Sequence, residues 1–268
     1  MKELATRVLS GLLYIVLILG SLYWSENAFL IVFFVLGGIS FGEFLKLIKL
    51  NKIVPFILYA GLFFVFAYQQ YSNYATSVML TITIFVDLFI IKDLFSKTEQ
   101  AAASPLKKYI LAVSYFVMGL IFLSLIPSFK GGFNPLLVAG VFALIWINDS
   151  FAYLVGRNFG KQKLFERISP KKTVEGFFGG LFFSCLASYF IANFTEALSP
   201  LKWLVISAIV CFFGTLGDLI QSKIKRQAAV KDSGNIMPGH GGMYDRLDSI
   251  LFTAPFVYLY LQILQYVP

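Results

Sequence analysis

The chain has 268 residues, of which 58% are hydrophobic and only 13% are charged. With a mean hydropathy of +0.78, this composition excludes a water-soluble globular protein. The formal net charge of +8 lies mainly between apolar runs, which is typical of a membrane protein with a defined orientation and gives no indication of nucleic-acid binding.

Apolar runs of about 17–25 residues can cross a bilayer as helices, and the sequence offers nine candidates. They cover residues 8–24, 28–45, 53–71, 77–91, 109–126, 135–155, 174–194, 203–221 and 249–266. The fourth run is short and contains Asp87. We therefore predict an all-α integral membrane protein with about nine transmembrane helices. No small-x-small cleavage site follows the first run, so we expect it to remain as an anchor.

The distribution of basic residues predicts the orientation. With a cytoplasmic N-terminus, nine crossings place 20 of the 22 Lys and Arg residues on the inner side and leave only Lys130 and Lys202 outside. This asymmetry follows the positive-inside tendency. We expect a multi-pass protein of the bacterial inner membrane with its C-terminus outside.

Polar chemistry is concentrated in the second half of the chain. Residues 1–108, with the first four spans, have only short or basic connections, whereas residues 109–268 carry two long charged loops, 156–173 and 222–248, on the cytoplasmic side. Three acids lie near inner ends of the early spans, where we expect lysine partners or a side chain that reaches water. They are Glu43, Asp87 and Asp93.

Three aspartates form a candidate metal site. Asp218 lies inside an apolar run, where a carboxylate costs roughly 2.5–3.5 kcal/mol and is therefore functional by default. Asp245 and Asp248 are three residues apart and share a face if Gly241 and Gly242 open a helix. Carboxylate oxygens suit Mg²⁺ or Mn²⁺ better than softer metals.

Basic residues near these acids can hold phosphate oxygens. The candidates are Lys171, Lys172, Lys225, Arg226, Lys231 and Arg246. Backbone N–H groups at Gly241 and Gly242 can approach an anion at the start of the last span, and Ser222 shares a helix face with Asp218. His240, between two glycines, is expected to be functional. The residues predict a polyphosphate held by metal and basic side chains at the cytoplasmic membrane edge.

Other catalytic motifs receive no support. Cys185 and Cys211 lie in the middle of apolar runs, where packing is the favoured role. A single histidine excludes an H-E-x-x-H zinc site, and neither a Walker A pattern nor a G-x-S-x-G turn stands out.

The pattern S-K-I-K-R-x4-K-D-S-G-x3-P-G-H-G-G-x2-D-R-x-D, from Ser222 to Asp248, resembles the signature of phosphatidate cytidylyltransferases, also called CDP-diacylglycerol synthases. Residues 169–176, S-P-K-K-T-V-E-G, are similar to a second block of that family, preceded by the matching Asn148-Asp149 and Gly156-Arg157. The resemblance covers residues 145–250 in its motifs and the earlier spans only in hydropathy. Met237 stands where the family often has Ile, Leu or Phe.

The resemblance implies a dimeric, Mg²⁺-dependent membrane enzyme that converts CTP and phosphatidic acid to CDP-diacylglycerol and pyrophosphate, with one or more divalent cations. It makes Asp218, Asp245 and Asp248 the metal-binding carboxylates. The other catalytic candidates are Lys225, Arg226, Lys231, Arg246 and His240. The substrate-binding candidates are Asn148, Asp149, Lys171, Lys172, Thr173, Glu175, Ser222, Asp232, Gly241 and Gly242.

Two other functions remain open. A CTP-dependent polyprenol or lipid kinase would share the grip on metal and triphosphate and differ in its lipid pocket. A transporter of anionic solutes is disfavoured because the charges lie at the inner edge of the membrane and no inverted repeat is visible.

Overall fold

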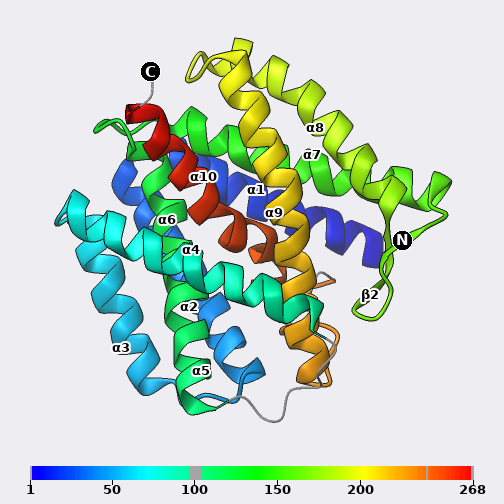
Figure 1. The fold of residues 1–268 in the computed structure, drawn as a ribbon, viewed down its shortest axis with the longest axis horizontal. Coiled ribbons are helices and arrows are strands. Elements are labelled where there is room, and N and C mark those ends of the chain that lie inside the picture. Colours follow the sequence, from blue (N-terminus) through cyan, green and yellow to red (C-terminus); the bar gives the residue numbers. More distant parts are fainter. Residues whose placement is uncertain (1, 97–103, 240, 267–268) are drawn as a thin grey trace.

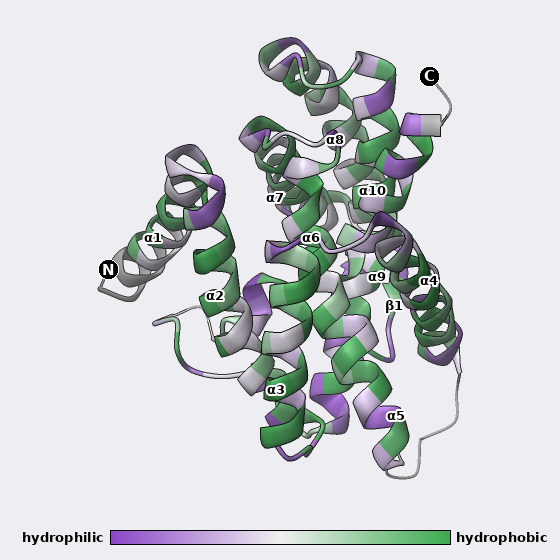
Figure 2. Cartoon of the chain, turned by 90° about the vertical axis from the view of Figure 1, so that its left-hand side faces the viewer, coloured by the Kyte–Doolittle hydropathy of each residue, from purple (hydrophilic) through white to green (hydrophobic). Residues whose placement is uncertain are grey.

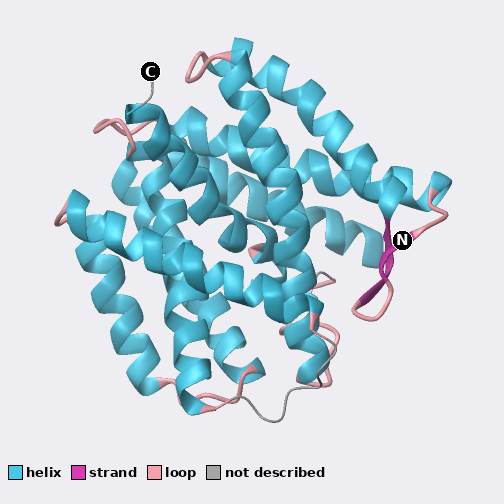
Figure 3. Cartoon of the chain, viewed as in Figure 1, coloured by secondary structure: helices cyan, strands magenta, loops and turns pink. Residues whose placement is uncertain are grey.

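The computed structural model describes residues 2–96, 104–239 and 241–266, which are almost entirely helical (Figures 1 and 3). The long helices are α1 (Lys2–Trp24), α2 (Glu26–Leu47), α3 (Ile53–Leu62), α4 (Asn73–Phe95), α7 (Pro135–Phe159), α8 (Val174–Thr195), α9 (Pro200–Gln227) and α10 (Asp248–Tyr266). A π-helical segment, η1 (Phe63–Tyr68), extends α3, and another, η2 (Leu111–Val117), joins α5 (Pro105–Ile110) to α6 (Met118–Leu125). Two 3₁₀ turns are η3 (Ile126–Ser128) and η4 (Tyr244–Arg246).

Each predicted apolar run coincides with one continuous helical stretch of the described chain. Five stretches are long and apolar enough to cross a membrane by length and composition: Glu26–Leu47, Pro105–Ser128, Pro135–Phe159, Val174–Thr195 and Pro200–Gln227. Hydrophobic residues occur along most of the helices (Figure 2), and some of them face outward, as on α8, where Phe178, Phe182 and Phe190 are exposed. The protein is therefore a multi-pass membrane protein, and a total of nine spans stays a prediction.

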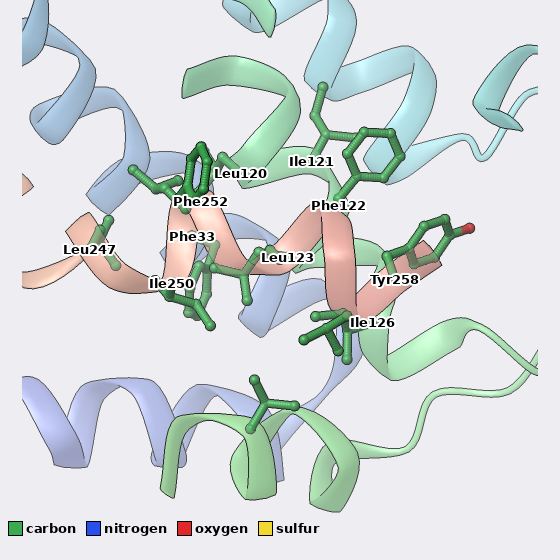
Figure 4. Close-up of a cluster of buried hydrophobic side chains, with 14 of the residues drawn as sticks. Phe33, Leu120, Ile121, Phe122, Leu123, Ile126, Leu247, Ile250, Phe252 and Tyr258 are labelled. Atoms are coloured by element: carbon green, nitrogen blue, oxygen red, sulfur yellow. The ribbon is translucent and has the colours of Figure 1, made fainter. Parts of the chain in front are cut away.

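Helix α10 lies at the centre of the molecule (Figure 1). Its buried Ile250 and Phe252 belong to a cluster with Phe33 of α2 and with Leu120 and Leu123 of α6 (Figure 4). A side chain at Gly119 of α6 would collide with the Leu251 carbonyl, and one at Gly217 of α9 would collide with the Asp248 carbonyl. Small residues thus let α6 and α9 approach the backbone of α10. These contacts hold the first turn of α10 in place.

Helices α7 and α8 pack along a stripe of small residues. Every fourth residue of α8, namely Gly176, Gly180, Ser184, Ser188 and Ala192, is buried. A Cβ at Gly176 would collide with the Ala152 carbonyl of α7, and one at Gly180 with Asn148. This close packing holds the start of α8 beside Asn148 and Asp149.

The segment 156–173, predicted as a charged loop in an all-α chain, contains a β-hairpin. Helix α7 continues to Phe159, and β1 (Lys163–Phe165) then pairs antiparallel with β2 (Ser169–Thr173). Tertiary contacts hold the hairpin: Phe165 packs edge-on against Phe95, and Arg167 donates hydrogen bonds to the Leu94 and Ser96 carbonyls at the end of α4. These partners are distant in sequence, so local pattern did not reveal the strands.

Candidate active site

Three acidic side chains from different helices interact electrostatically. Asp149 lies on α7, Asp218 on α9 and Asp248 at the first position of α10. Asp248 interacts with both of the others, and Asp149 interacts with Asp218. Asp218 and Asp248 therefore lie near enough to influence each other's charge, as does Asp149, which sequence placed among the substrate-binding residues. Their role as metal ligands stays a prediction.

Lys172 brings a positive charge to this group from the end of β2. Its Nζ lies 2.5 Å from Asp218 Oδ2, and it also interacts with Asp149. The Ser222 hydroxyl, one turn after Asp218, donates to Asp218 Oδ1 at 3.3 Å. The Asp218 side chain is still 33% exposed and that of Lys172 is 26% exposed, so both are accessible to a ligand.

A cavity of about 210 Å³ opens beside these acids. One part of its wall is apolar and comes from α1 and α7, through residues such as Ile15, Phe142 and Trp146. The other part is polar and contains Asp149, Asp245, Arg246 and Asp248, and Arg246 interacts electrostatically with Asp149. Such a cavity fits a molecule that carries a charged group on an apolar body.

Asp245 is already engaged by protein donors. Its Oδ1 accepts from Lys225 Nζ at 2.8 Å and from Gln221 Nε2 at 3.3 Å, and its Oδ2 accepts from the N–H groups of Ser233 and Gly242 at 2.9 and 3.0 Å. Burial favours the neutral acid, but these hydrogen bonds and the charge of Lys225 outweigh it and lower the pKa of Asp245. Asp245 thus holds the loop together.

The predicted metal trio of Asp218, Asp245 and Asp248 therefore stays a prediction, with Asp245 held by protein donors in this structure. Within residues 2–96, 104–239 and 241–266, no three Asp, Glu, His or Cys side chains gather into a ready-made metal cage. The physical reason is that Lys225 and two backbone N–H groups occupy the oxygens of Asp245.

Several other predicted residues have structural contacts. Thr173 caps α8 by accepting from the Gly176 N–H, and Glu175 accepts from the Gln162 N–H where the hairpin begins. Asn148 donates to Asp149 Oδ1 at 3.3 Å. Gly241 adopts a φ of +89°, which favours glycine, and Gly242 has no room for a side chain.

The remaining candidates lie at the periphery. Lys171, Lys231 and Asp232 are exposed. Arg226 is also exposed and donates to the Val230 carbonyl just after α9. His240 lies outside the described residues.

The early acids differ from expectation in two of three cases. Asp93 pairs with Lys107 and Lys223, as predicted. Asp87 is 1% exposed instead of reaching water, and Glu43 is 4% exposed and accepts hydrogen bonds from the 222–248 loop. Sequence reasoning missed the role of Glu43; a lone carboxylate within an apolar run was the available signal.

Comparison with known proteins identifies the family of the chain. The model of the cytidylyltransferase family matches residues 5–264. The chain is 33% identical to the phosphatidate cytidylyltransferase of Bacillus subtilis (strain 168), over 97% of this chain and 98% of that protein. It is 31% identical to the phosphatidate cytidylyltransferase of Staphylococcus saprophyticus subsp. saprophyticus, over 93% of this chain and 95% of that protein. The chain belongs to the cytidylyltransferase family.

Proposed function

We propose that this protein transfers the cytidylyl group of CTP to phosphatidic acid, giving CDP-diacylglycerol and pyrophosphate. The observation that carries the proposal is the cavity that has an apolar wall on one side and Asp149, Asp245, Arg246 and Asp248 on the other. Asp218, paired with Lys172, interacts electrostatically with Asp149 and Asp248. The relatives named phosphatidate cytidylyltransferase, which match nearly the whole chain, supply the substrates.

The cavity and the Lys172–Asp218 pair would hold different parts of the two substrates. The glycerol and upper acyl carbons of phosphatidic acid would lie against Ile15, Phe142 and Trp146, with the lipid phosphate near Arg246. The triphosphate of CTP would lie toward Lys172, which pairs with Asp218 in this structure. Arginine binds phosphate with two parallel hydrogen bonds, and lysine acts as a point charge.

Asp218 and Asp248 fit a Mg²⁺ ion, with Asp149 beside them. Their oxygens are hard ligands, and carboxylates that interact across one site repel one another unless a cation neutralises them. Mg²⁺ is commonly held by one or two carboxylates together with substrate phosphates, so a cage of three acids is not required. When bound, the ion supplies charge neutralisation for the triphosphate and for departing pyrophosphate.

The reaction needs no covalent catalyst from the protein. A phosphate oxygen of phosphatidic acid forms a bond to the α-phosphorus of CTP as the bond to pyrophosphate breaks. Because that oxygen is already anionic, no proton has to be removed from it. Arg246 and Lys172 orient the two substrates and offset their charges, and positioning with electrostatic stabilisation supplies most of the rate in such transfers.

The test uses purified protein with CTP, Mg²⁺ and phosphatidic acid. We expect release of pyrophosphate and formation of a CDP-lipid. Formation of CDP and a phosphorylated lipid from a polyprenol or lipid alcohol would favour a kinase instead, and absence of turnover with both substrates would contradict an enzyme of this type.

Direct displacement predicts inversion at phosphorus. A CTP analogue with a chiral α-thiophosphate should give CDP-diacylglycerol of inverted configuration, because one in-line step reverses the centre once. The configuration of the product, determined by phosphorus NMR, checks this. Net retention, or a cytidylylated protein trapped without lipid, would contradict a single step.

We also propose a cytoplasmic N-terminus, an outside C-terminus and a homodimer. Single cysteines at Lys163 and Asn235 should react with an impermeant thiol reagent only from the cytoplasmic side, and one at Lys130 only from outside. The parent protein is the control, since Cys185 and Cys211 lie within long apolar helices. Labelling of the first two positions from opposite faces would contradict a shared site.

A further inference from the structure

Glu43 connects the N-terminal helices to the 222–248 loop. It lies near the end of α2, and its side chain has three neutral donors, all from that loop. Oε1 accepts from the Met243 N–H at 3.2 Å, and Oε2 accepts from the Tyr244 N–H at 2.9 Å and from the Ser233 hydroxyl at 2.8 Å. A buried carboxylate with three donors is strongly held in place.

Glu43 and Asp245 together clasp two parts of the loop. The consecutive N–H groups of Gly242, Met243 and Tyr244 donate to Asp245, Glu43 and Glu43 respectively. Ser233 donates to both acids, through its N–H to Asp245 and through its hydroxyl to Glu43. The segment that leads into Arg246 and Asp248 is thus fixed at its start.

The surrounding glycines fit this clasp. A Cβ at Gly242 would collide with the Ser233 hydroxyl and the Glu43 carboxylate, and a Cβ at Gly234 would also collide with Glu43. The backbone of the loop therefore lies directly against the Glu43 carboxylate at both Gly234 and Gly242. This close fit distinguishes Glu43 from an acid that happens to be buried.

We propose that Glu43 is a positioning residue for the cytidylyl transfer: it sets the start of η4 and thereby the placement of Arg246 and Asp248 in the cavity. This inference rests on the proposed function. The N-terminal helices would thus contribute to the site through α2, which supplies the carboxylate that accepts hydrogen bonds from the 222–248 loop.

Glu43→Gln is the sharpest variant because it keeps the size and removes one acceptor. If the amide oxygen takes the place of Oε2, the NH₂ group faces the Met243 N–H; if it takes the place of Oε1, the NH₂ group faces the Tyr244 N–H. One backbone donor loses its acceptor in either orientation. Glu26→Gln is the matched control, since Glu26 lies at the other end of α2 and accepts from Ser128.

Hydrogen exchange without substrate and steady-state kinetics give independent readouts. In Glu43→Gln we expect faster amide exchange in residues 241–246 and a fall in kcat/KM of about 10- to 100-fold, mainly in kcat, as is common when a residue behind the reacting groups is changed. The thermal midpoint should fall modestly, because one buried N–H loses its acceptor, while Glu26→Gln should match the parent in exchange and kcat.

Unchanged exchange and kcat in a folded Glu43→Gln protein would overturn the proposal. If that variant does not fold, Ser233→Ala decides: it removes one of the three donors to Glu43, and we expect a roughly 3- to 10-fold lower kcat, whereas an unchanged kcat would overturn the proposal. A wild-type protein that makes no CDP-lipid would contradict the proposed function instead, and the exchange measurement separates the two failures.

Discussion

Asp218→Asn should lower turnover on the order of 10³-fold, the scale seen when a group that stabilises transition-state charge is removed. Asparagine has almost the same size and can still accept from Ser222. It cannot balance Lys172, which lies 2.5 Å from the carboxylate, and it is a poor ligand for a hard cation. Pyrophosphate release with CTP and phosphatidic acid, measured over a Mg²⁺ titration, checks the expectation.

The matched control for this variant is Asp87→Asn. Asp87 is also an aspartate on a long helix, but it is buried on α4 and does not line the cavity. We expect it to retain most activity, and both variants should remain monodisperse in detergent. Near-normal turnover in Asp218→Asn, or in Asp248→Asn, would remove that residue from the metal assignment.

Hydropathy and charge predicted the helical framework because both are local properties. Nine apolar runs coincide with nine helical stretches of the described chain, since a lipid environment requires every backbone group of a span to be satisfied within its own helix. Asp218 was found for a related reason: a carboxylate in an apolar run is costly, so its presence indicates function. The helix on which it lies follows from the same pattern, whereas its partner Lys172 comes from a β-hairpin that this pattern did not reveal.

The different surroundings of Asp218, Asp245 and Asp248 could not be predicted from sequence. Spacing places Asp245 and Asp248 on one face only if a helix starts before both, whereas α10 starts at Asp248 and Asp245 lies in a 3₁₀ turn. The oxygens of Asp245 are then taken by Lys225, Ser233 and Gly242. Glu43 was missed for the same reason, because its donors lie about 200 residues away in the chain.

The Lys225–Asp245 pair should show the second large effect, and it should separate stability from activity. The two side chains are only 11% and 8% exposed. Removing one member of a buried pair leaves a charge without its partner and costs about 3–5 kcal/mol. Lys225→Met and Asp245→Asn should therefore each lower the thermal midpoint clearly and abolish turnover.

The double variant Lys225→Met with Asp245→Asn distinguishes a structural role of Asp245, as the partner of Lys225, from a role as a metal ligand. The asparagine oxygen can accept from the Ser233 and Gly242 N–H groups while its NH₂ group faces the position that the lysine left, so no charge remains buried without a partner. We expect the thermal midpoint to recover by more than half of the larger single loss, since contacting residues are not additive. Turnover should stay low because Lys225 also interacts with Asp218. If the decreases in thermal midpoint of the two single variants simply add in the double variant, the structural pairing of Lys225 with Asp245 is contradicted. Asp245 then returns to the candidate metal ligands.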